Sequence, residues 1–200
     1  NKGSLKMSIN SYNTELLTKR LLEALGEDKG IKHIIDIGYE IIGNPISLVD
    51  TSRKTIVLTN SPEVEDDLTW QELARDGYFS DDTMKHNYSV GLTNKLSTSS
   101  GPFFWAKDDY IKYNRLLSRI TFRDKTIGIL AIMESKKPFK ESDLELASIL
   151  CNAISAEMQK NTFLHSNLGS GYEDFILNLL EGKIKDKKNE DFKNRNEIIN

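Results

Sequence analysis

Residues 115–134 of this chain of 200 residues read RLLSRITFRDKTIGILAIME. Alternate positions of the first eight residues would share one face of an extended strand: Leu116, Ser118, Ile120 and Phe122. The polar residues 123–125 then offer a turn, and the apolar run TIGILAIME follows it. This pattern predicts an antiparallel hairpin of two long strands.

The residues after this hairpin, KPFKESDLELASILCNAISAEMQKN (137–161), predict a strand end and a long helix. Pro138 has no N–H to donate to a sheet, so it is expected to close the strand, and Phe139 can turn back into the core. Ser142 and Glu145 have the spacing of a capping box, which predicts a helix over about 141–163. The helix would carry one apolar stripe: Leu146, Leu150, Ala153, Ile154 and Met158.

Two helices and a shorter hairpin are predicted before this unit. Leucines at helical spacing predict a helix over 13–26, and isoleucines predict another over 30–43, where Gly43-Asn44-Pro45 ends it. The period then changes to two in PISLVD and KTIVLTN, with a turn at 51–53. Because the strands return by tight turns and not by helical crossovers, we predict an α+β fold around an antiparallel sheet.

About fifty residues without strong periodicity separate the two hairpins, which is too long for a bare loop. Capping-box spacing from Thr69 to Glu72 predicts a short helix from Trp70 to about Arg75. Ser80 is a weaker start for a helix over DDTMKHN, and NKLSTSSGP is a polar break. We expect this segment to form a lid over the sheet.

Six large aromatic residues of this segment are candidates for a ligand pocket: Trp70, Tyr78, Phe79, Tyr88, Phe104 and Trp105. The alternative is that the rings only cover the exposed face of the sheet. On the next strand, Arg119 or Arg115 would pair with a carboxylate ligand, whereas most arginines on strands are solvated.

Composition and charge exclude several classes of protein. The chain is 38% hydrophobic and 28% charged, as is ordinary for a soluble protein. Its net charge of −3 gives no electrostatic basis for binding DNA by itself. It has no apolar window of membrane-spanning length, and its N-terminus lacks the apolar core of a secretion signal. The single Cys151 forbids an internal disulfide and fits a reducing compartment. We therefore predict a cytoplasmic protein.

No motif for catalysis, metal binding or a cofactor can be assembled. The histidines at 33, 86 and 165 lack neighbours at metal-ligand spacing, and neither a Ser-His-Asp order nor a phosphate-binding loop is present. Cys151 lacks a nearby cation to lower its pKa, so we expect a small buried hydrophobe and not a redox sensor. The first two helices have the spacing of a helix-turn-helix, but the second offers only Lys32 and His33 as basic residues, which favours packing helices.

Several motifs in a fixed order resemble a known family. The strand IGILA (127–131), the Pro138-Phe139 pair and the helix opened by Asp143-Leu144 resemble the C-terminal half of GAF domains. IIGNPISLVDTSRKTIVLTN, the Trp70 helix with its downstream Gly77-Tyr78, and YEDFILNLLEGKI resemble the sensory region of PucR/CdaR-type bacterial transcription regulators. The resemblance spans about 30–184 and implies a GAF/PAS-like sheet with the terminal helices on one face and the lid on the other.

The resemblance also implies a role and a division of the chain. We expect a small-molecule-sensing domain that is a homodimer through helices 13–43 and 141–163 and contacts DNA only through another domain. The Asn-Lys-Phe-Asp-Glu signature of cyclic-nucleotide binding is missing, and Cys151 does not suit a bilin. The alternative is a dimerisation module whose pocket is filled by its own side chains. The expected parts are a flexible N-terminus (1–12), the sensory domain (13–165), a linker and C-terminal helix (166–182) and a charged tail (183–200).

Overall fold

The computed structural model describes the backbone of residues 2–180 and the side chains of residues 11–160. The chain divides into two compact units, Asn1–Gln159 and Lys160–Asn200. The strands found in the described residues all lie in the first unit, and the described part of the second unit is helical. The predicted charged tail, 183–200, lies outside the described residues.

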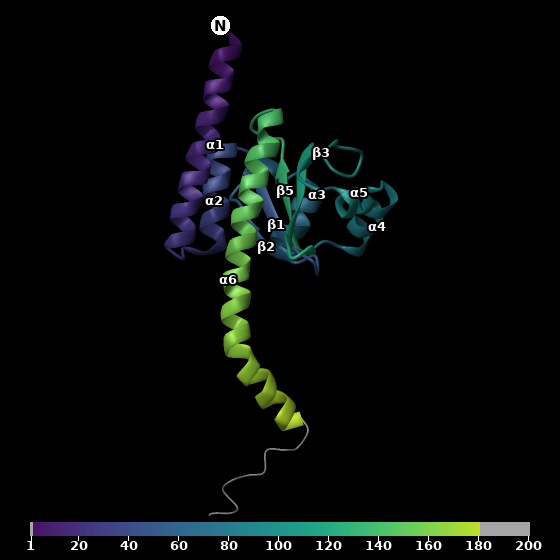
Figure 1. Ribbon diagram of the computed structural model, residues 1–200. Coiled ribbons are helices and arrows are strands. Elements are labelled where there is room, and N and C mark those ends of the chain that lie inside the picture. The colour runs from purple at the N-terminus through teal and green to yellow at the C-terminus, as the bar shows by residue number, and fades with distance from the viewer. Residues whose placement is uncertain (1, 181–200) are drawn as a thin grey trace, which may run out of the picture. The chain divides into compact units, whose positions relative to one another are not determined.

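An antiparallel sheet of five strands forms the centre of the first unit (Figure 1). The strands, in the spatial order β2-β1-β5-β4-β3, are β1 (Ile46–Asp50), β2 (Thr55–Leu58), β3 (Phe103–Trp105), β4 (Arg115–Phe122) and β5 (Lys125–Met133). Both predicted hairpins are confirmed, since β1 pairs with β2 and β4 pairs with β5. The hairpins meet where β1 pairs with β5, and the predicted α+β class is confirmed.

The turn between β4 and β5 is tighter than predicted. Phe122 pairs with Lys125, so Arg123 and Asp124 alone form the turn. Their φ angles are 47° and 63°, which is the left-handed conformation that a two-residue hairpin turn of type I′ requires. Aspartate enters this conformation more readily than most residues, so the turn forms without glycine.

Three helices cover one face of the sheet (Figure 1): α1 (Lys2–Gly26), α2 (Gly30–Ile42) and the part of α6 (Glu141–Leu180) that belongs to the first unit. Of the residues of β4 predicted to share one face, Leu116 and Ile120 belong to the main core beneath these helices, whereas Phe122, beyond a register irregularity after Ile120, does not. Representative core side chains are Leu17, Ile35, Leu116, Ile120, Leu150 and Ile154. Within the described residues, no helix is both long and apolar enough to cross a membrane.

Gly38 of α2 lies in close contact with α6 and β1. A Cβ at this position would lie 2.6 Å from Cδ2 of Leu150 and 3.4 Å from Cδ1 of Ile46. Non-bonded carbons normally stand about 3.5–4.0 Å apart. The absence of a side chain at residue 38 therefore sets how closely α2 approaches its neighbours.

The buried Asn44 organises the joint between β5 and α6. Its Oδ1 accepts hydrogen bonds from the backbone N–H groups of Ser135, Lys136 and Lys137 at 3.0–3.3 Å. Its Nδ2 donates to the carbonyl oxygen of Lys137 at 2.8 Å. One side chain thus satisfies three N–H groups and one carbonyl of this connection.

The strand-to-helix joint is where the sequence predicts it, but its details differ. β5 ends at Met133, before Pro138, and Phe139 packs against the main core as expected. The Asp143 carboxylate accepts a hydrogen bond from the N–H of Lys140 at 2.9 Å. Lys140 and Asp143, and not Ser142 and Glu145, therefore make this capping contact, and the helix begins at Glu141.

The segment between the hairpins covers the opposite face of the sheet (Figure 1). Its helices are the 3₁₀ turn η1 (Pro62–Val64), α3 (Leu68–Gln71), the π-helical turn η2 (Glu72–Asp76), α4 (Asp81–Ser89) and α5 (Leu92–Thr98). The predicted cap at Ser80 is confirmed, because its side chain accepts a hydrogen bond from Thr83 N–H. α5 falls where the sequence predicts a polar break, and the aromatic run 103–105 forms the edge strand β3.

The predicted capping box from Thr69 to Glu72 is wrong. Oδ1 of Asp67 caps α3 instead, accepting from the N–H groups of Thr69 and Trp70 at 3.1 Å each. The Glu72 carboxylate accepts from the Ser80 hydroxyl at 2.6 Å and from the Thr83 hydroxyl at 2.8 Å. Glu72 thus joins η2 to the start of α4, because its own turn is already capped.

The ends of two helices differ from the predicted parts of the chain. α1 begins at Lys2, whereas the sequence places its start at about residue 13 and a flexible segment before it. The segment 2–12 contains no proline, so nothing in it prevents helix formation. The helix α6 also continues through Gly169, Ser170 and Gly171, where the sequence predicts a break. A glycine weakens a helix by about 1 kcal/mol relative to alanine but does not forbid one.

Candidate functional site

A cavity of about 250 Å³ lies between the sheet and the helices α4 and α5. Its floor is the sheet face opposite the main core: Ser47, Val49, Leu117, Ile129 and Ala131. Its cover comes from the segment between the hairpins: Phe79, Met84, Asn87, Leu92, Leu96 and Ser97. Such a mainly apolar hollow with a few polar groups has the usual composition of a small-molecule site.

The alternation of β4 brings two arginines to this cavity. Arg115, Leu117 and Arg119 line it, whereas the intervening Leu116 and Ile120 belong to the main core. A third arginine, Arg53, lies beyond the end of β1 and also lines the cavity. The cavity is therefore an apolar chamber bordered by guanidinium groups.

Arg115 is buried and is only partly satisfied by its neighbours. Its Nη2 donates to both carboxylate oxygens of Asp67, at 3.0 and 3.2 Å, and to the hydroxyl of Thr69 at 2.5 Å. Its Nε is buried and has no hydrogen-bond partner among the described residues. Burial lowers the pKa of the guanidinium, and the nearby Asp67 carboxylate opposes that shift.

Arg119 is held by neutral acceptors. Its Nη2 donates to the carbonyl oxygen of Ser99, just after α5, at 2.7 Å. Its Nη1 lies 3.5 Å from the hydroxyl of Thr126 on β5. Among the side chains that the structure describes, no carboxylate forms an ion pair with Arg119.

The other charged residues of the lining are engaged elsewhere. Arg53 Nη1 forms an exposed ion pair with Asp81 at 2.8 Å, at the start of α4. Asp50 Oδ1 accepts from the N–H groups of Ser52 and Lys54, at 2.8 and 2.9 Å, and so stabilises the β1–β2 turn. Arg119 is thus the cation of the lining with the fewest charged neighbours.

One end of α4 is fastened to the loop before β4. His86 Nε2 lies 2.9 Å from Oδ2 of Asp108, and its ring stacks on Tyr110 with centroids 4.4 Å apart. Burial raises the pKa of Asp108, but hydrogen bonds from the N–H groups of Ile111 and Tyr110 and from His86 outweigh it, so the pKa lies below its ordinary value. These contacts hold α4, which is part of the cover of the cavity, against the loop before β4.

The structure brings both candidate arginines but only one of the six candidate aromatics to this cavity. Arg115, Arg119 and Phe79 line it. Trp70 is buried with Val64 and Met133 in a separate cluster, and Trp105 packs in another with Leu92, Leu117 and Ala131.

The other three predicted aromatics also lie elsewhere. Tyr78 and Tyr88 are 53% and 78% exposed, and Phe104 stacks on Phe139 with centroids 5.4 Å apart. The expected grouping of six rings around one pocket is therefore not found, because most of them cover the sheet or face solvent.

Sequence reasoning missed most of the aliphatic cover. Met84, Leu92 and Leu96 are aliphatic residues that belong to no binding motif. The helix α5 was not predicted because most of its residues are polar apart from its two leucines. The i, i+4 spacing of Leu92 and Leu96 is the signal that identifies an apolar helix face there. Arg115 was an arginine candidate from the sequence, but its buried partner Asp67 lies 48 residues away.

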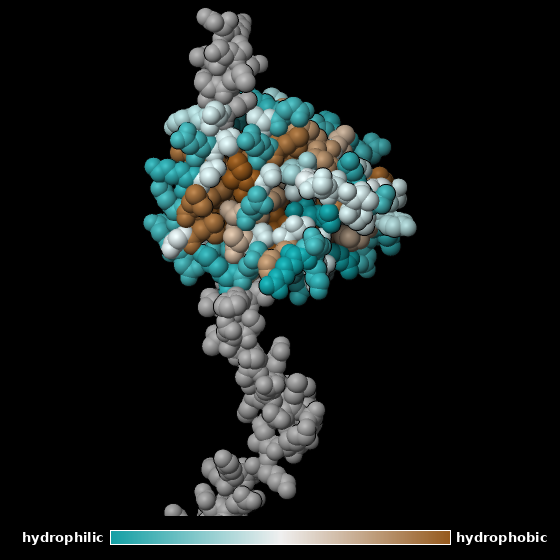
Figure 2. Space-filling model, in the orientation of Figure 1, coloured by the Kyte–Doolittle hydropathy of each residue, from teal (hydrophilic) through white to brown (hydrophobic). Residues whose placement is uncertain are grey.

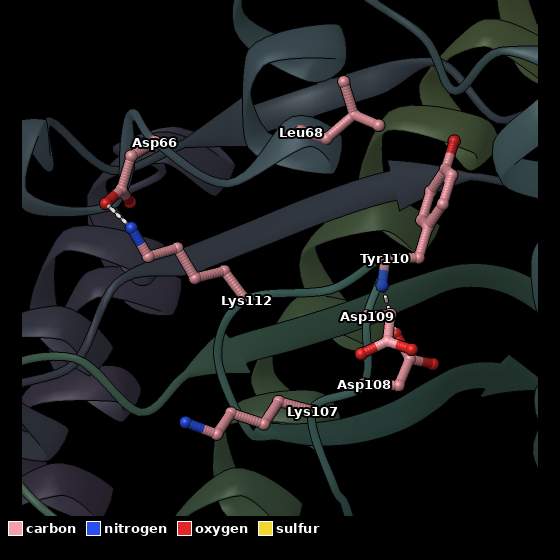
Figure 3. A pocket seen from close by; sticks show the side chains of 7 residues that line it. All are labelled: Asp66, Leu68, Lys107, Asp108, Asp109, Tyr110 and Lys112. Carbon is pink, nitrogen blue, oxygen red and sulfur yellow. Dashed lines mark hydrogen bonds and ion pairs between the residues drawn. The ribbon is translucent and has the colours of Figure 1, made fainter.

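A second hollow lies on the surface near the same loop (Figure 3). It is open to solvent and lined by Asp66, Leu68, Lys107, Asp108, Asp109, Tyr110 and Lys112. Figure 3 shows that some of its charged side chains already have partners within the hollow: Lys112 bonds to Asp66, and the Asp108 carboxylate accepts a hydrogen bond from Tyr110 N–H. The cavity under α4 and α5 is less open to solvent and more apolar, so it is the better candidate for a ligand site.

Two further predictions concern reactive groups. In the described residues, no group of three His, Cys, Asp or Glu side chains is placed to hold a metal ion. Cys151 is buried in the main core, as predicted, and burial raises the pKa of its thiol to about 11.

The antiparallel sheet, the helices on one face and the covered cavity on the other define a GAF-like fold. The chain is similar to the GAF domain of a proposed sensor histidine kinase from Pseudomonas syringae pv. tomato, with a TM-score of 0.59 and 12% identity over 84% of this chain and 99% of that one. It also matches the GAF domain/HD domain protein from Geobacter sulfurreducens, with a TM-score of 0.46 and 10% identity over 69% and 98% of the two chains. No family model and no curated protein matches the sequence. The likeness therefore concerns the fold.

Proposed function

We propose that this chain is a small-molecule-sensing domain of a cytoplasmic bacterial transcription regulator of the PucR/CdaR type. The observation that carries the proposal is the apolar, arginine-bordered cavity under α4 and α5. A metabolite seated there contacts the sheet and its cover at once. DNA binding then belongs to a separate domain.

The sheet offers a short route from the cavity to the helices. Leu117 lines the cavity, while its neighbours Leu116 and Ser118 point to the other face, where Leu116 packs in the helical core. A ligand shifts the arrangement of the helices only if it binds one arrangement more tightly than the other. The expected signal is thus a change in helix packing behind β4 and β5.

The helices α1 and α6 favour association of two copies. A mainly apolar groove between them is lined by Thr18, Leu21, Leu22, Leu25, Ile149, Asn152 and Ala153. Leu22 is 65% exposed, and Figure 2 shows hydrophobic residues gathered on this side of the molecule. A symmetric homodimer would remove this surface from water. The same groove favours the alternative function, a dimerisation module without a ligand.

Two measurements on the same protein test these functions. Sedimentation gives the oligomeric state of the wild-type chain and of Leu22→Glu, with Leu68→Glu as a control because Leu68 is 44% exposed but lies outside the groove. A thermal-shift screen of metabolites, followed by calorimetry, tests the cavity. A dimer with a ligand supports the sensor, and a dimer with no ligand supports the module. A monomer in which Leu22→Glu changes nothing contradicts the dimer.

A further inference from the structure

The chemistry of the cavity walls narrows the class of ligand. Arg119 brings a positive charge to the lining, and among the described residues it donates only to the backbone carbonyl of Ser99 and the hydroxyl of Thr126. A cation in an apolar wall is stabilised strongly by an anion that binds it directly, because such charge-assisted hydrogen bonds are about twice as strong as neutral ones. Arg119 is therefore the natural anchor for an acidic group.

Arg115 offers a different kind of contact at the other end of the floor. Its charge is already matched by Asp67, and all its hydrogen bonds come from Nη2. The buried Nε remains a donor without a partner among the described residues. Leaving such a donor unsatisfied costs about 1–3 kcal/mol. Nε itself is closed to solvent-sized atoms, so a neutral oxygen acceptor of a ligand is favoured at the neighbouring Nη1, which makes no hydrogen bond among the described residues.

The spacing between the two arginines sets the outline of the ligand. Four residue steps along β4 place their Cα atoms about 13 Å apart, and both side chains are long enough to reduce the gap between their guanidinium groups. Leu117 lies between them on the same face, with Ala131 beside it on β5. The middle of the chamber is therefore apolar.

Resting on the proposed sensory function, we propose that the cavity binds a small carboxylic acid. Its carboxylate pairs with Arg119, its short apolar chain lies over Leu117, and a carbonyl or hydroxyl oxygen at the far end accepts from Arg115. The volume of about 250 Å³ is smaller than the roughly 300–1,000 Å³ of drug-sized sites, so the ligand is a compact metabolite. A carboxylate is preferred to a phosphate ester because the second charge of the ester would lose hydration without a second free cation.

Binding of four probes to the full chain, followed by NMR titration, tests this ligand class. The probes are 4-oxopentanoate, pentanoate, the neutral 4-oxopentanamide and butyl phosphate. We expect 4-oxopentanoate to bind at least tenfold more tightly than the amide and more tightly than pentanoate and butyl phosphate. The shifted resonances should belong to residues of β4, α4 and α5.

Three variants assign the two ends of the ligand. Arg119→Gln should weaken 4-oxopentanoate and pentanoate at least tenfold while leaving the amide unchanged. Arg115→Lys keeps the charge beside Asp67 and should reduce the preference for 4-oxopentanoate over pentanoate. Arg123→Gln, an exposed arginine of the β4–β5 turn outside the cavity, should behave as the wild type. A melting temperature close to wild type shows that each variant is folded.

The outcomes separate the ligand class from the sensory role. Equal binding of the acids to wild type and Arg119→Gln overturns the carboxylate anchor. If the amide or butyl phosphate binds best in the cavity, a sensor remains but its acid class is wrong. If none of the probes binds the folded protein, the inference falls, and the metabolite screen described above decides the sensory function separately.

Discussion

Replacement of Asp67 by alanine measures how far the segment over the sheet depends on one buried carboxylate. Asp67 is 0% exposed. It accepts from the N–H groups of Thr69 and Trp70, from Lys112 N–H at 3.0 Å, and from Arg115 Nη2 at 3.0 and 3.2 Å. The carboxylate thus caps α3, holds the loop before β4 and neutralises a buried cation.

The expected loss follows from these contacts. Removing an N-cap costs about 1 kcal/mol, and removing one partner of a buried ion pair costs about 3–5 kcal/mol. Because the same oxygens serve both roles, the two costs overlap, and we expect the free energy of unfolding to fall by about 4 kcal/mol. This is a large part of the roughly 5–15 kcal/mol that stabilises a typical domain.

Urea denaturation followed by circular dichroism and tryptophan fluorescence gives this free energy. Asp66→Ala is the matched control, because Asp66 is 52% exposed in its pair with Lys112 and such exposed ion pairs contribute little to stability. Adding Arg115→Leu to Asp67→Ala should restore part of the loss, since no buried charge is then unpaired. A loss below about 1 kcal/mol for Asp67→Ala, or equal losses for both aspartates, would refute the reasoning.

Three further measurements test other parts of the structure. Asn44→Ala leaves several buried N–H groups of the β5–α6 joint without their acceptor and should lower the free energy of unfolding by about 2–3 kcal/mol in the same assay. Burial raises the pKa of the Cys151 thiol to about 11, so at pH 8 its reaction with a disulfide reagent should be roughly a hundredfold slower in the folded than in the denatured chain, and equal rates would contradict its burial. Burial and the hydrogen bond to Asp66 raise the pKa of Tyr113 to about 12, so its stabilising contribution is complete below the ordinary value of about 10 and is lost as the pH rises toward 12. Ultraviolet titration should show one late tyrosine that disappears in Tyr113→Phe.

The sheet and its helices were predictable because the signals are local. Alternation in 115–122 and the turn that follows are properties of adjacent residues, and the same holds for the joint around Phe139. The cap of α3 could not be predicted from the sequence, because Asp67 and Thr69 are both good cap residues and lie two positions apart. Only the buried partner Arg115, supplied by a distant strand, favours Asp67.

The site was harder to predict than the fold because aromatic residues serve several surfaces. Trp70 and Phe79 lie in the same segment, but only Phe79 lines the cavity, since Trp70 fills the space beside Met133. Which surface a ring covers depends on how the helices dock, and that information is not local. The arginine alternation on β4 is the part of the site that strand periodicity does reveal.

The close approach at Gly38 has a consequence for how this chain can diverge. A larger residue at position 38 meets the fully buried Leu150 first, since the added carbon would lie only 2.6 Å from that side chain. Homologues that keep this helix spacing should therefore change the two positions together, with a shorter side chain at 150 whenever 38 gains a methyl group. Paired changes at 38 and 150 in an alignment of homologues would thus indicate the contact between α2 and α6 from sequence alone.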